Sequence, residues 1–559
     1  MHNSFILDLA KKTPTAEQII NSDYFQTILD EYLRNVQVND THLFELLNST
    51  FKRNLHLELK QTFLKLLKTN YQSLKASLYP LSEDQDEILS LLDGLYDTWR
   101  NKQRYALINY SLHPLTSAAF IKKNEQLGAA IVKTYRIIYE NVLGHEQMVY
   151  RQLPSGTNAG FILKEDKELN YPQELAFMKG SLLLQTLLIR PPFIASSEQN
   201  TRKGIFKELA LPLRDEDYDS SDHIGVALKI KGHVGYVFIS KAFMSFIVGL
   251  GNLFRVVDFN EVKDVKPDFI IAYGVNVEHK ECYYYKSKDG IYVGVCPFQA
   301  EIDYFGYLKK MILTLHNLVM IDEGKLPIHG AAIKVILNNG KSYNIVIMGD
   351  SGAGKSETIE ALGTISDSSI HGIVTIYDDM GTFILQDKEV YTNGTETGAF
   401  VRLDDLDKGY SLRSIDRSVY LNIETVNSRV VIPITTYKET KSLHHVDAFL
   451  LADNFTNSPV GITEYKDEVS AKKDFIKGER VAKGTTSEVG RVTTFLANPF
   501  GPVQRQKDCE VLIDQFFDAL YKNGIFVGKI YTKLSLDPLH GPQLGAKALL
   551  KLIKGFKGE

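Results

Sequence analysis

The chain has 559 residues, of which 44% are hydrophobic and 24% are charged. These proportions are ordinary for a folded globular protein, and the length allows two or three domains with a large buried core. A formal net charge of -4 disfavours nucleic acid or an anionic membrane as the partner, because both bind concentrated positive charge.

The termini and the cysteines indicate the cellular location. No uninterrupted apolar run approaches the roughly 20 residues that span a bilayer, and the N-terminus lacks the order of regions found in a signal peptide. Three cysteines, Cys282, Cys296 and Cys509, are widely scattered along the chain, which disfavours a disulfide framework and a thiolate metal cluster. We therefore expect a cytoplasmic protein with no nucleic-acid and no membrane partner.

Residues 1–125 have the pattern of a helical domain. Apolar residues recur at three- and four-residue spacing in FQTILDEYLRNV, over 41–68 and in DEILSLLDGLYDTWR. Thr41 and Ser82 are the expected helix caps. This part contains no catalytic constellation, so we expect an accessory domain that serves oligomerisation or contact with another protein.

Residues 126–325 and 326–559 have the mixed pattern of two α/β or α+β domains. In the first, AAIVKTYRIIYENVL predicts a helix, HIGVALKI, VGYVFIS and DFIIAYGV predict strands, and DYFGYLKKMILTLHNLVMI predicts a second helix. In the second, AAIKVIL, YNIVIMG, GIVTIYDD, GTFIL, RVVIPITT and DAFLLA predict strands. Asn339-Gly340 predicts a tight hairpin turn. The expected fold class is therefore mixed α/β.

The segment GDSGAGKS lies between an apolar strand and a helical pattern, the order typical of a phosphate-binding loop. Glycines let successive backbone N–H groups point at a phosphate, and the following helix adds its positive end. Lys355 is expected to contact the β- and γ-phosphates, and the Ser356 hydroxyl to bind Mg²⁺. The other residues expected to bind the nucleotide are Gly349, Asp350, Ser351, Gly352, Ala353 and Gly354.

An acidic pair follows this loop. Asp378 and Asp379 lie 23 and 24 residues after Lys355, at the end of the apolar run GIVTIYDD. A carboxylate at the end of a neighbouring strand is suited to a metal ion that also contacts the nucleotide. We therefore expect a metal site at this pair.

The loop and its neighbours resemble the phosphoenolpyruvate carboxykinase superfamily, which includes HPr kinase/phosphorylase. GDSGAGKSE with IHGA upstream is similar to the HPr kinase branch. YFGYLKK, which ends in Lys309 and Lys310 and is followed nineteen residues later by His329, resembles the ATP-dependent carboxykinases, where a lysine pair precedes a metal-binding histidine at this spacing. The similarity covers about residues 300 to 559.

The resemblance implies both a fold and an activity. It implies a carboxykinase-like P-loop catalytic domain at 326–559 and an α/β N-terminal lobe at 126–325, with the helical domain as an addition. The activity would be ATP-dependent decarboxylation of oxaloacetate to an enolate, followed by transfer of the γ-phosphoryl group to the enolate oxygen. Mg²⁺ and Mn²⁺ would assist, because a divalent cation stabilises the enolate charge as a Lewis acid.

The resemblance also implies roles for individual side chains. GTETGAFVRL is similar to the family's Glu-Gly-Gly segment, which would place Glu396 near the nucleotide. VNSRVVIPI is similar to the strand that carries a substrate arginine, here Arg429, which with Lys309 would hold carboxylate or phosphate oxygens. The implied ligands of Mn²⁺ are Lys310 as a neutral amine, His329 and Asp379. The implied catalytic set is Lys309, Lys310, Lys355, Asp378 and Arg429.

The acceptor side departs from the family pattern. The carboxykinase motif Arg-Ser-Pro-Lys-Asp, whose arginine binds the dicarboxylate, is absent from the sequence. Arg151, Arg190 and Arg202, each in a turn-rich segment, are candidate replacements. Two alternatives therefore stay open: a kinase of the same superfamily acting on another hydroxyl acceptor, either a small metabolite or a protein serine, and a non-catalytic nucleotide-binding scaffold.

Overall fold

The protein is described by a computed structural model over residues 4–7, 13–102, 105–108, 117–150, 159–165, 169, 171–190, 192–202, 204–365, 367, 369–403, 417–425, 427–482 and 490–556. The chain divides into two compact units, Met1–Gln147 and Met148–Glu559. Helices and several sheets combine in a mixed α/β architecture. No helix within these ranges has the length and apolar character needed to cross a membrane.

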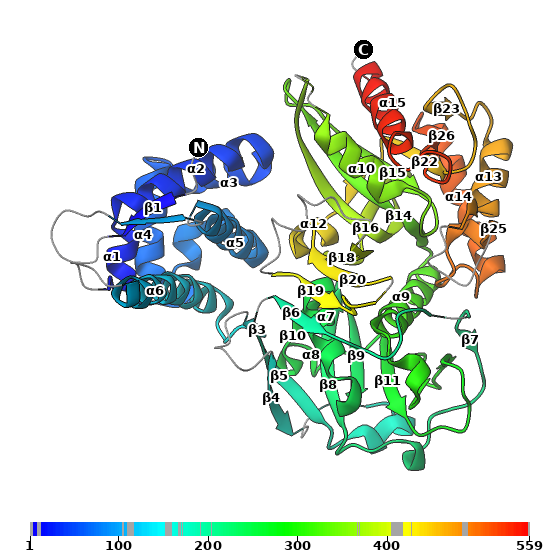
Figure 1. Cartoon of the computed structure of the whole chain (residues 1–559), viewed down its shortest axis with the longest axis horizontal. Helices are drawn as coiled ribbons and strands as arrows, with labels where there is room; N and C mark the ends of the chain where they lie inside the picture. The colour runs from blue at the N-terminus through cyan, green and yellow to red at the C-terminus, as the bar shows by residue number, and fades with distance from the viewer. Residues whose placement is uncertain are drawn as a thin grey trace. The chain divides into compact units, whose positions relative to one another are not determined.

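The first unit is a group of amphipathic helices around one core, drawn in blue to cyan in Figure 1. Phe25, Leu29, Phe63, Leu92 and Trp99 are buried at its centre. Two short parallel strands, β1 (Ser4–Leu7) and β2 (Tyr105–Ile108), accompany the helices. The helices are α1 (Ala16–Ile20), α2 (Asp23–Asn39), α3 (Thr41–Thr50), α4 (Leu55–Leu66), α5 (Gln85–Lys102) and α6 (Ser117–Leu143).

The helical run expected over 41–68 is two helices. Helix α3 ends at Thr50. Helix α4 begins after Asn54, whose side chain accepts a hydrogen bond from the Leu57 amide and caps the new helix. The cap of α3 is Asp40, whose side chain accepts from the Leu43 amide, so the expectation of Thr41 as the cap was wrong.

The start of α5 and the end of the unit also differ from expectation. The Ser82 hydroxyl donates to the Lys75 carbonyl and does not cap α5, which begins at Gln85. Helix α6 runs through residue 125, and the helical unit continues to Gln147.

The second unit contains two large mixed sheets. The first has the order β3-β5-β8-β9-β11-β13-β12-β7, with β4 on β5 and β10 on β8. Its strands are β3 (Val149–Tyr150), β4 (Ala159–Glu165), β5 (Leu182–Ile189), β7 (Lys207–Glu208), β8 (His223–Ile230), β9 (His233–Ser240), β10 (Arg255–Val257), β11 (Phe269–Val275), β12 (Tyr283–Lys286) and β13 (Tyr292–Pro297).

The second large sheet has the order β21-β17-β16-β14-β15-β22-β26-β23. Its strands are β14 (Leu326–Leu337), β15 (Ser342–Met348), β16 (Ile370–Gln386), β17 (Glu389–Gly394), β21 (His444–His445), β22 (Ala448–Asp453), β23 (Ile462–Glu464) and β26 (Phe526–Tyr531). The hairpin expected at Asn339-Gly340 is confirmed, since β14 and β15 are antiparallel and Gly340 has a φ of +82°.

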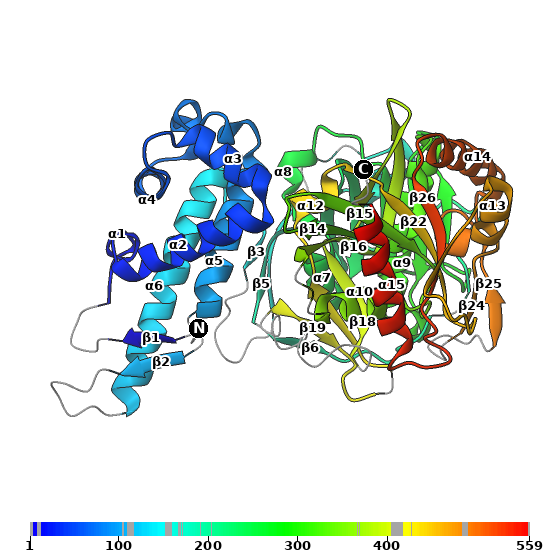
Figure 2. The same ribbon diagram turned by 90° about the horizontal axis from the view of Figure 1, so that it is seen from above.

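Smaller sheets and helices complete this unit. One small sheet has the order β18-β20-β19-β6, and the other joins β24 and β25. Their strands are β6 (Phe193–Ala195), β18 (Gly398–Arg402), β19 (Val419–Leu421), β20 (Arg429–Pro433), β24 (Glu479–Val481) and β25 (Arg491–Thr493). The helices are α7 (Ser245–Leu253), α8 (Phe259–Val262), α9 (Phe305–Asp322), α10 (Lys355–Thr364), α12 (Tyr437–Lys441), α13 (Glu468–Lys477), α14 (Gln506–Lys522) and α15 (Gly541–Gly555), of which α15 packs along α10 (Figure 2).

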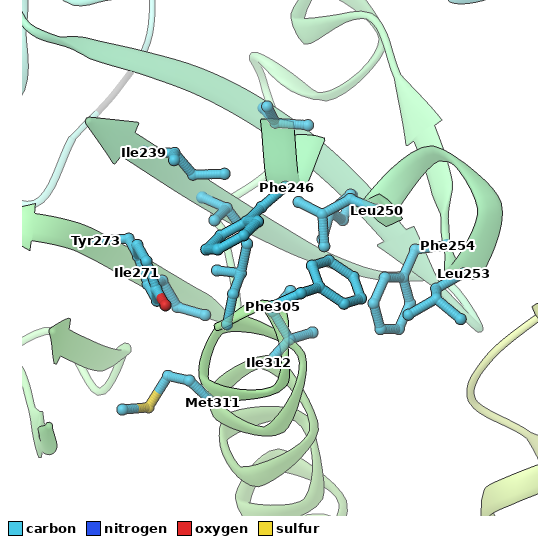
Figure 3. Close-up of a cluster of buried hydrophobic side chains, with 14 of the residues drawn as sticks. Ile239, Phe246, Leu250, Leu253, Phe254, Ile271, Tyr273, Phe305, Met311 and Ile312 are labelled. Atoms are coloured by element: carbon cyan, nitrogen blue, oxygen red, sulfur yellow. The ribbon is translucent and has the colours of Figure 1, made fainter. Parts of the chain in front are cut away.

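Helix α9 joins the two large sheets. It contacts β11 and β13 of one sheet and β14 of the other, and nearly all of its residues are buried, which matches its apolar character on all sides. Figure 3 shows Phe305 of this helix packed with Phe246 and Leu250 of α7, whereas Met311 lies on another side of the helix. Because α9 packs on both sheets, the two domains expected to meet near residue 325 form one compact unit.

Strand β16 is longer than expected. GIVTIYDD and GTFIL were expected as separate strands, but residues Ile370–Gln386 form one strand that pairs with β14 and then folds back on β17. Gly381 allows this continuity, because a Cβ there would lie 2.1 Å from the ring of Tyr377. Asp378 and Asp379 therefore lie in the middle of a strand, not at its end.

Candidate phosphoryl-transfer site

The GDSGAGKS loop connects β15 to α10, as the sequence predicts. Gly352 and Gly354 have φ angles of +80° and +90°, in the left-handed region that favours glycine. A Cβ on Gly354 would lie 2.5 Å from the Thr532 hydroxyl, and that hydroxyl donates to the Ala353 carbonyl over 2.7 Å. The residue after β26 thus supports the loop from one side and leaves no room for a larger side chain.

Lys355 and Ser356 begin helix α10 beside the strand that carries Asp378. Lys355 is buried, and its ammonium donates to the Asp350 carbonyl over 3.2 Å. The Ser356 hydroxyl donates to a carboxylate oxygen of Asp378 over 2.9 Å. Burial raises the pKa of Asp378, although Lys355 and Ser356 act in the opposite direction. A hydroxyl and a carboxylate in contact beside a phosphate loop are suited to Mg²⁺.

Asp350, the second residue of the loop, binds protein groups. It is buried, pairs with the Arg480 guanidinium at 3.0 Å and accepts from the Thr494 hydroxyl over 3.3 Å and from the Ser351 amide over 2.7 Å. Burial opposes its ionisation, but Arg480, the Ser351 amide and Lys355 act in the opposite direction, and the pKa of Asp350 is lowered. Arg480 on β24 lines the same cavity, and no local sequence signal identified it.

The carboxylate of Asp379 binds three of the expected functional side chains. One of its oxygens accepts from Lys309 over 2.7 Å and from Lys310 over 2.9 Å, and the other lies 2.9 Å from Nε2 of His329. Asp379 has a φ of +117°, a strained conformation for a residue with a side chain and a common feature of functional sites. Burial opposes its ionisation, but the two lysines hold the pKa of Asp379 well below its ordinary value.

The ring of His329 has a defined tautomer. Its Nδ1 lies 2.7 Å from the Ala497 carbonyl, which can only accept, so the proton lies on Nδ1. Burial lowers the pKa of His329 and favours the neutral ring, whose Nε2 then directs a lone pair at the carboxylate of Asp379. Two electron-pair donors that face each other fit a bound cation, and an Nδ1–H bonded to a carbonyl is the usual support of a metal-binding histidine.

The amine of Lys310 completes this set. Burial lowers the pKa of Lys310, and the neighbouring charge of Lys309 acts in the same direction, which favours the neutral amine that a ligand role requires. Among the described residues, no three His, Cys, Asp or Glu side chains form a group that could hold a metal. A site at His329 and Asp379 therefore depends on Lys310 as its third protein ligand.

Glu396 lies against Lys309. Both side chains are fully buried, and the ammonium and carboxylate are 3.1 Å apart. Burial raises the pKa of Glu396 to about 7, while Asp379 and Glu396 together overcome the effect of burial and raise the pKa of Lys309. Glu396 and Lys309 thus form a buried ion pair, and the expected place of Glu396 near the nucleotide stays a prediction.

The ring of Phe400 lies near both Lys309 and Arg429. The ammonium lies 5.5 Å and the guanidinium 5.4 Å from the ring centroid, distances at which an aromatic face attracts a cation. Arg429 pairs in register with Arg402 across β20 and β18, so the two side chains share one face of the small sheet and both line the cavity. Arg402 was not predicted, because the pairing depends on strand register.

The ring of Phe500 lies near Lys310 and Arg202. The ammonium lies 4.5 Å and the guanidinium 5.2 Å from its ring centroid. Arg202 also packs 5.3 Å from the ring of Phe206, and burial lowers the pKa of its guanidinium. Of the three candidate replacements for the missing motif arginine, Arg202 lines the cavity, Arg190 is exposed at the end of β5 and Arg151 lies outside the described residues.

These groups line one cavity of about 650 Å³. The phosphate loop, Ser356 and Asp378 form its wall on one side, and Arg202, Arg402 and Arg429 contribute to the rest of the lining. Comparison of the sequence with models of known protein families and with curated proteins finds no match. The cavity joins the GDSGAGKS loop to an arginine-rich region suited to an anionic molecule.

The buried carboxyl of Glu396 predicts a pH dependence of stability. Its pKa rises from 4.5 to about 7 on folding, so between these pH values the folded chain retains a proton that the unfolded chain has lost. The free energy of unfolding should therefore fall from pH 4.5 to pH 7, by at most about 3 kcal/mol for this group.

Replacing Glu396 by Gln should flatten this fall in urea unfolding experiments at the two pH values. Glu301→Gln, at an exposed position, is the control and should retain the wild-type slope. A Glu396→Gln variant with the wild-type slope would contradict the assignment.

Proposed function

We propose that this chain is an ATP-dependent phosphoryl-transfer enzyme of the phosphoenolpyruvate carboxykinase type, which converts oxaloacetate and ATP to phosphoenolpyruvate, carbon dioxide and ADP. The observation that supports it most is the meeting of Lys310, His329 and Asp379 beside the phosphate loop. A phosphate loop alone fits many nucleotide-binding proteins. A second cation site at the acceptor end of the same cavity fits transfer to an oxygen that bears negative charge.

The donor half of the reaction belongs to the loop and helix α10. The loop amides and the N-terminal end of α10 bind the nucleotide phosphates, and Lys355 neutralises charge on the β- and γ-phosphates. Ser356 and Asp378, which are in contact, would hold Mg²⁺. The half-buried position of Asp378 limits access of water to this pair.

The acceptor half belongs to α9, β14 and β16. His329, Asp379 and Lys310 would hold Mn²⁺, which when bound supplies a Lewis acid for the enolate oxygen. His329 remains neutral and oriented through its bond to Ala497. Lys309, held by Asp379 and Glu396, keeps its positive charge close to the oxygen that receives the phosphoryl group.

We assign the recognition of the acceptor to the arginines that line the cavity. Arg402 and Arg429 lie side by side in register, and a guanidinium pair can bind carboxylate oxygens with parallel hydrogen bonds. Nε of Arg429 is buried and has no hydrogen-bond partner among the described residues, so a ligand oxygen would satisfy it. Arg202 provides a further cation on the opposite aromatic platform, Phe500.

A second candidate function is a kinase of the same superfamily that phosphorylates another hydroxyl, on a small metabolite or a protein serine. The absence of Arg-Ser-Pro-Lys-Asp and the string GDSGAGKSE favour it. A nucleotide-binding scaffold is the third reading. It has no use for the buried set of Lys309, Lys310, Asp379 and Glu396, because burying charged groups costs free energy that only function or pairing offsets.

A coupled assay tests the proposed reaction. The purified full chain with ATP, Mg²⁺, Mn²⁺ and oxaloacetate should form phosphoenolpyruvate and ADP in equal amounts. Lys355→Ala should lower turnover by at least about 100-fold, because it removes the charge that stabilises the transferring phosphoryl group. Lys341→Ala, at an exposed position of the β14–β15 turn, is the matched control and should keep wild-type turnover.

Two outcomes of this assay would contradict the proposal, one for the acceptor alone and the other for phosphoryl transfer as a whole. Bound ATP without phosphoenolpyruvate rejects the carboxykinase reading and directs attention to hydroxyl acceptors. Full turnover in Lys355→Ala rejects phosphoryl transfer at this loop.

The second cation site has its own test. His329→Ala should weaken Mn²⁺ binding by at least about 10-fold, measured from the electron paramagnetic resonance signal of free Mn²⁺, and should change ATP affinity much less. His444→Ala removes another buried histidine of the same sheet and serves as the control. Equal Mn²⁺ affinity in wild type and His329→Ala would reduce His329 to a structural role.

A further inference from the structure

Two of the three cysteines lie opposite each other in the first large sheet. Strands β12 and β13 are antiparallel, and Tyr283 pairs with Val295. The next opposed positions in this register are Cys282 and Cys296. Cys282 and Cys296 are therefore neighbours in the sheet although they are separated in the sequence.

The two thiols point to the same face of the sheet. Both cysteines belong to the hydrophobic core that packs on α9, as do Tyr284 and Tyr292 two and four positions away on the same strands. Both cysteines are free. Directly opposed residues of an antiparallel pair have Cβ atoms about 4.5–5.5 Å apart, close to the separation of about 3.8 Å in a disulfide.

We propose that Cys282 and Cys296 form a redox modification site, which closes to a cross-strand disulfide when the protein meets a peroxide. The Cys282 thiolate attacks one oxygen of hydrogen peroxide, the O–O bond breaks, and the leaving hydroxide takes a proton to give water and a sulfenic acid. The Cys296 sulfur then attacks the Cys282 sulfur. The S–O bond breaks, and the departing hydroxide takes the Cys296 proton as a second water.

The different exposure of the two cysteines determines the order of the two steps. Cys282 is 8% exposed and follows the exposed Glu281, whereas Cys296 is fully buried. Cys282 is therefore the residue that meets the oxidant, and Cys296 is the residue that resolves it.

Cys282 lies beside strand β7, next to the residue that packs on Arg202 of the cavity lining. Strand β7 is parallel to β12, with Lys207 opposite Tyr283, so Phe206 is the neighbour of Cys282 on that strand. The ring of Phe206 packs on the guanidinium of Arg202. A disulfide that draws Cys282 toward Cys296 would disturb this packing. Arg202 would then bind an anionic acceptor more weakly, a consequence that rests on the proposed function.

Peptide mapping tests the disulfide without any assay of activity. Trypsin cleaves after Lys280, Lys286 and Lys288, so the two cysteines fall in different peptides. After treatment of the full chain with hydrogen peroxide and alkylation of the remaining thiols, we expect a linked peptide pair that dithiothreitol separates. The Cys509→Ser variant, which retains the pair, should give the same result, whereas Cys282→Ser and Cys296→Ser should give no linked peptide.

Other outcomes would overturn the site. Oxidation of Cys282 only to a sulfinic acid, a linkage that includes Cys509, or no oxidation at a peroxide dose that oxidises free glutathione would each reject the pair.

The consequence for the cavity is measured separately. In the oxidised protein the KM for oxaloacetate should rise at least about threefold, ATP affinity should stay unchanged, and Cys296→Ser should be insensitive to peroxide. An unchanged KM with the disulfide formed would reject the connection to Arg202. Absence of any turnover before oxidation would instead reject the proposed function and leave the disulfide result standing.

Discussion

The carboxylate of Asp379 is the interaction on which the candidate site depends. It binds Lys309 and Lys310 from α9 and faces His329 from β14, so three elements meet at one side chain. An unpaired carboxylate at this depth would be costly, and so would the buried Lys309 ammonium without it. The left-handed backbone at Asp379 is held against its strain by these bonds and by the pairing of β16 with β14.

Fold and electrostatics are therefore linked through α9. This helix is apolar enough to be buried between the two large sheets, and it carries two lysines into that buried position. Asp379 and Glu396 lie close to these lysines. The ring of Phe400 lies near Lys309 and Arg429, and the ring of Phe500 near Lys310 and Arg202. The protein thus surrounds one cavity with basic side chains that pack beside carboxylates and aromatic faces.

The sequence predicted the local parts of this site and missed the parts set by tertiary structure. The phosphate loop, α9 and the strand that carries Asp378 follow from periodicity, glycine placement and spacing, which are local signals. The register that sets Arg402 beside Arg429, the ion pair of Glu396 and the opposed cysteines depend on strand pairing between distant segments. The acidic pair ends the apolar run GIVTIYDD, which predicts a strand end, whereas the missing Cβ of Gly381 accommodates Tyr377 and lets the strand continue.

The most direct test of the central claim is a crystal structure of the full chain with ATP and Mn²⁺, in which anomalous scattering locates the cation. The account predicts a Mn²⁺ peak within coordination distance of Nε2 of His329, a carboxylate oxygen of Asp379 and Nζ of Lys310, separate from the cation at Ser356. It also predicts that Lys309 remains paired with Glu396. A structure with ATP in the loop and no cation at His329 and Asp379 would contradict the account.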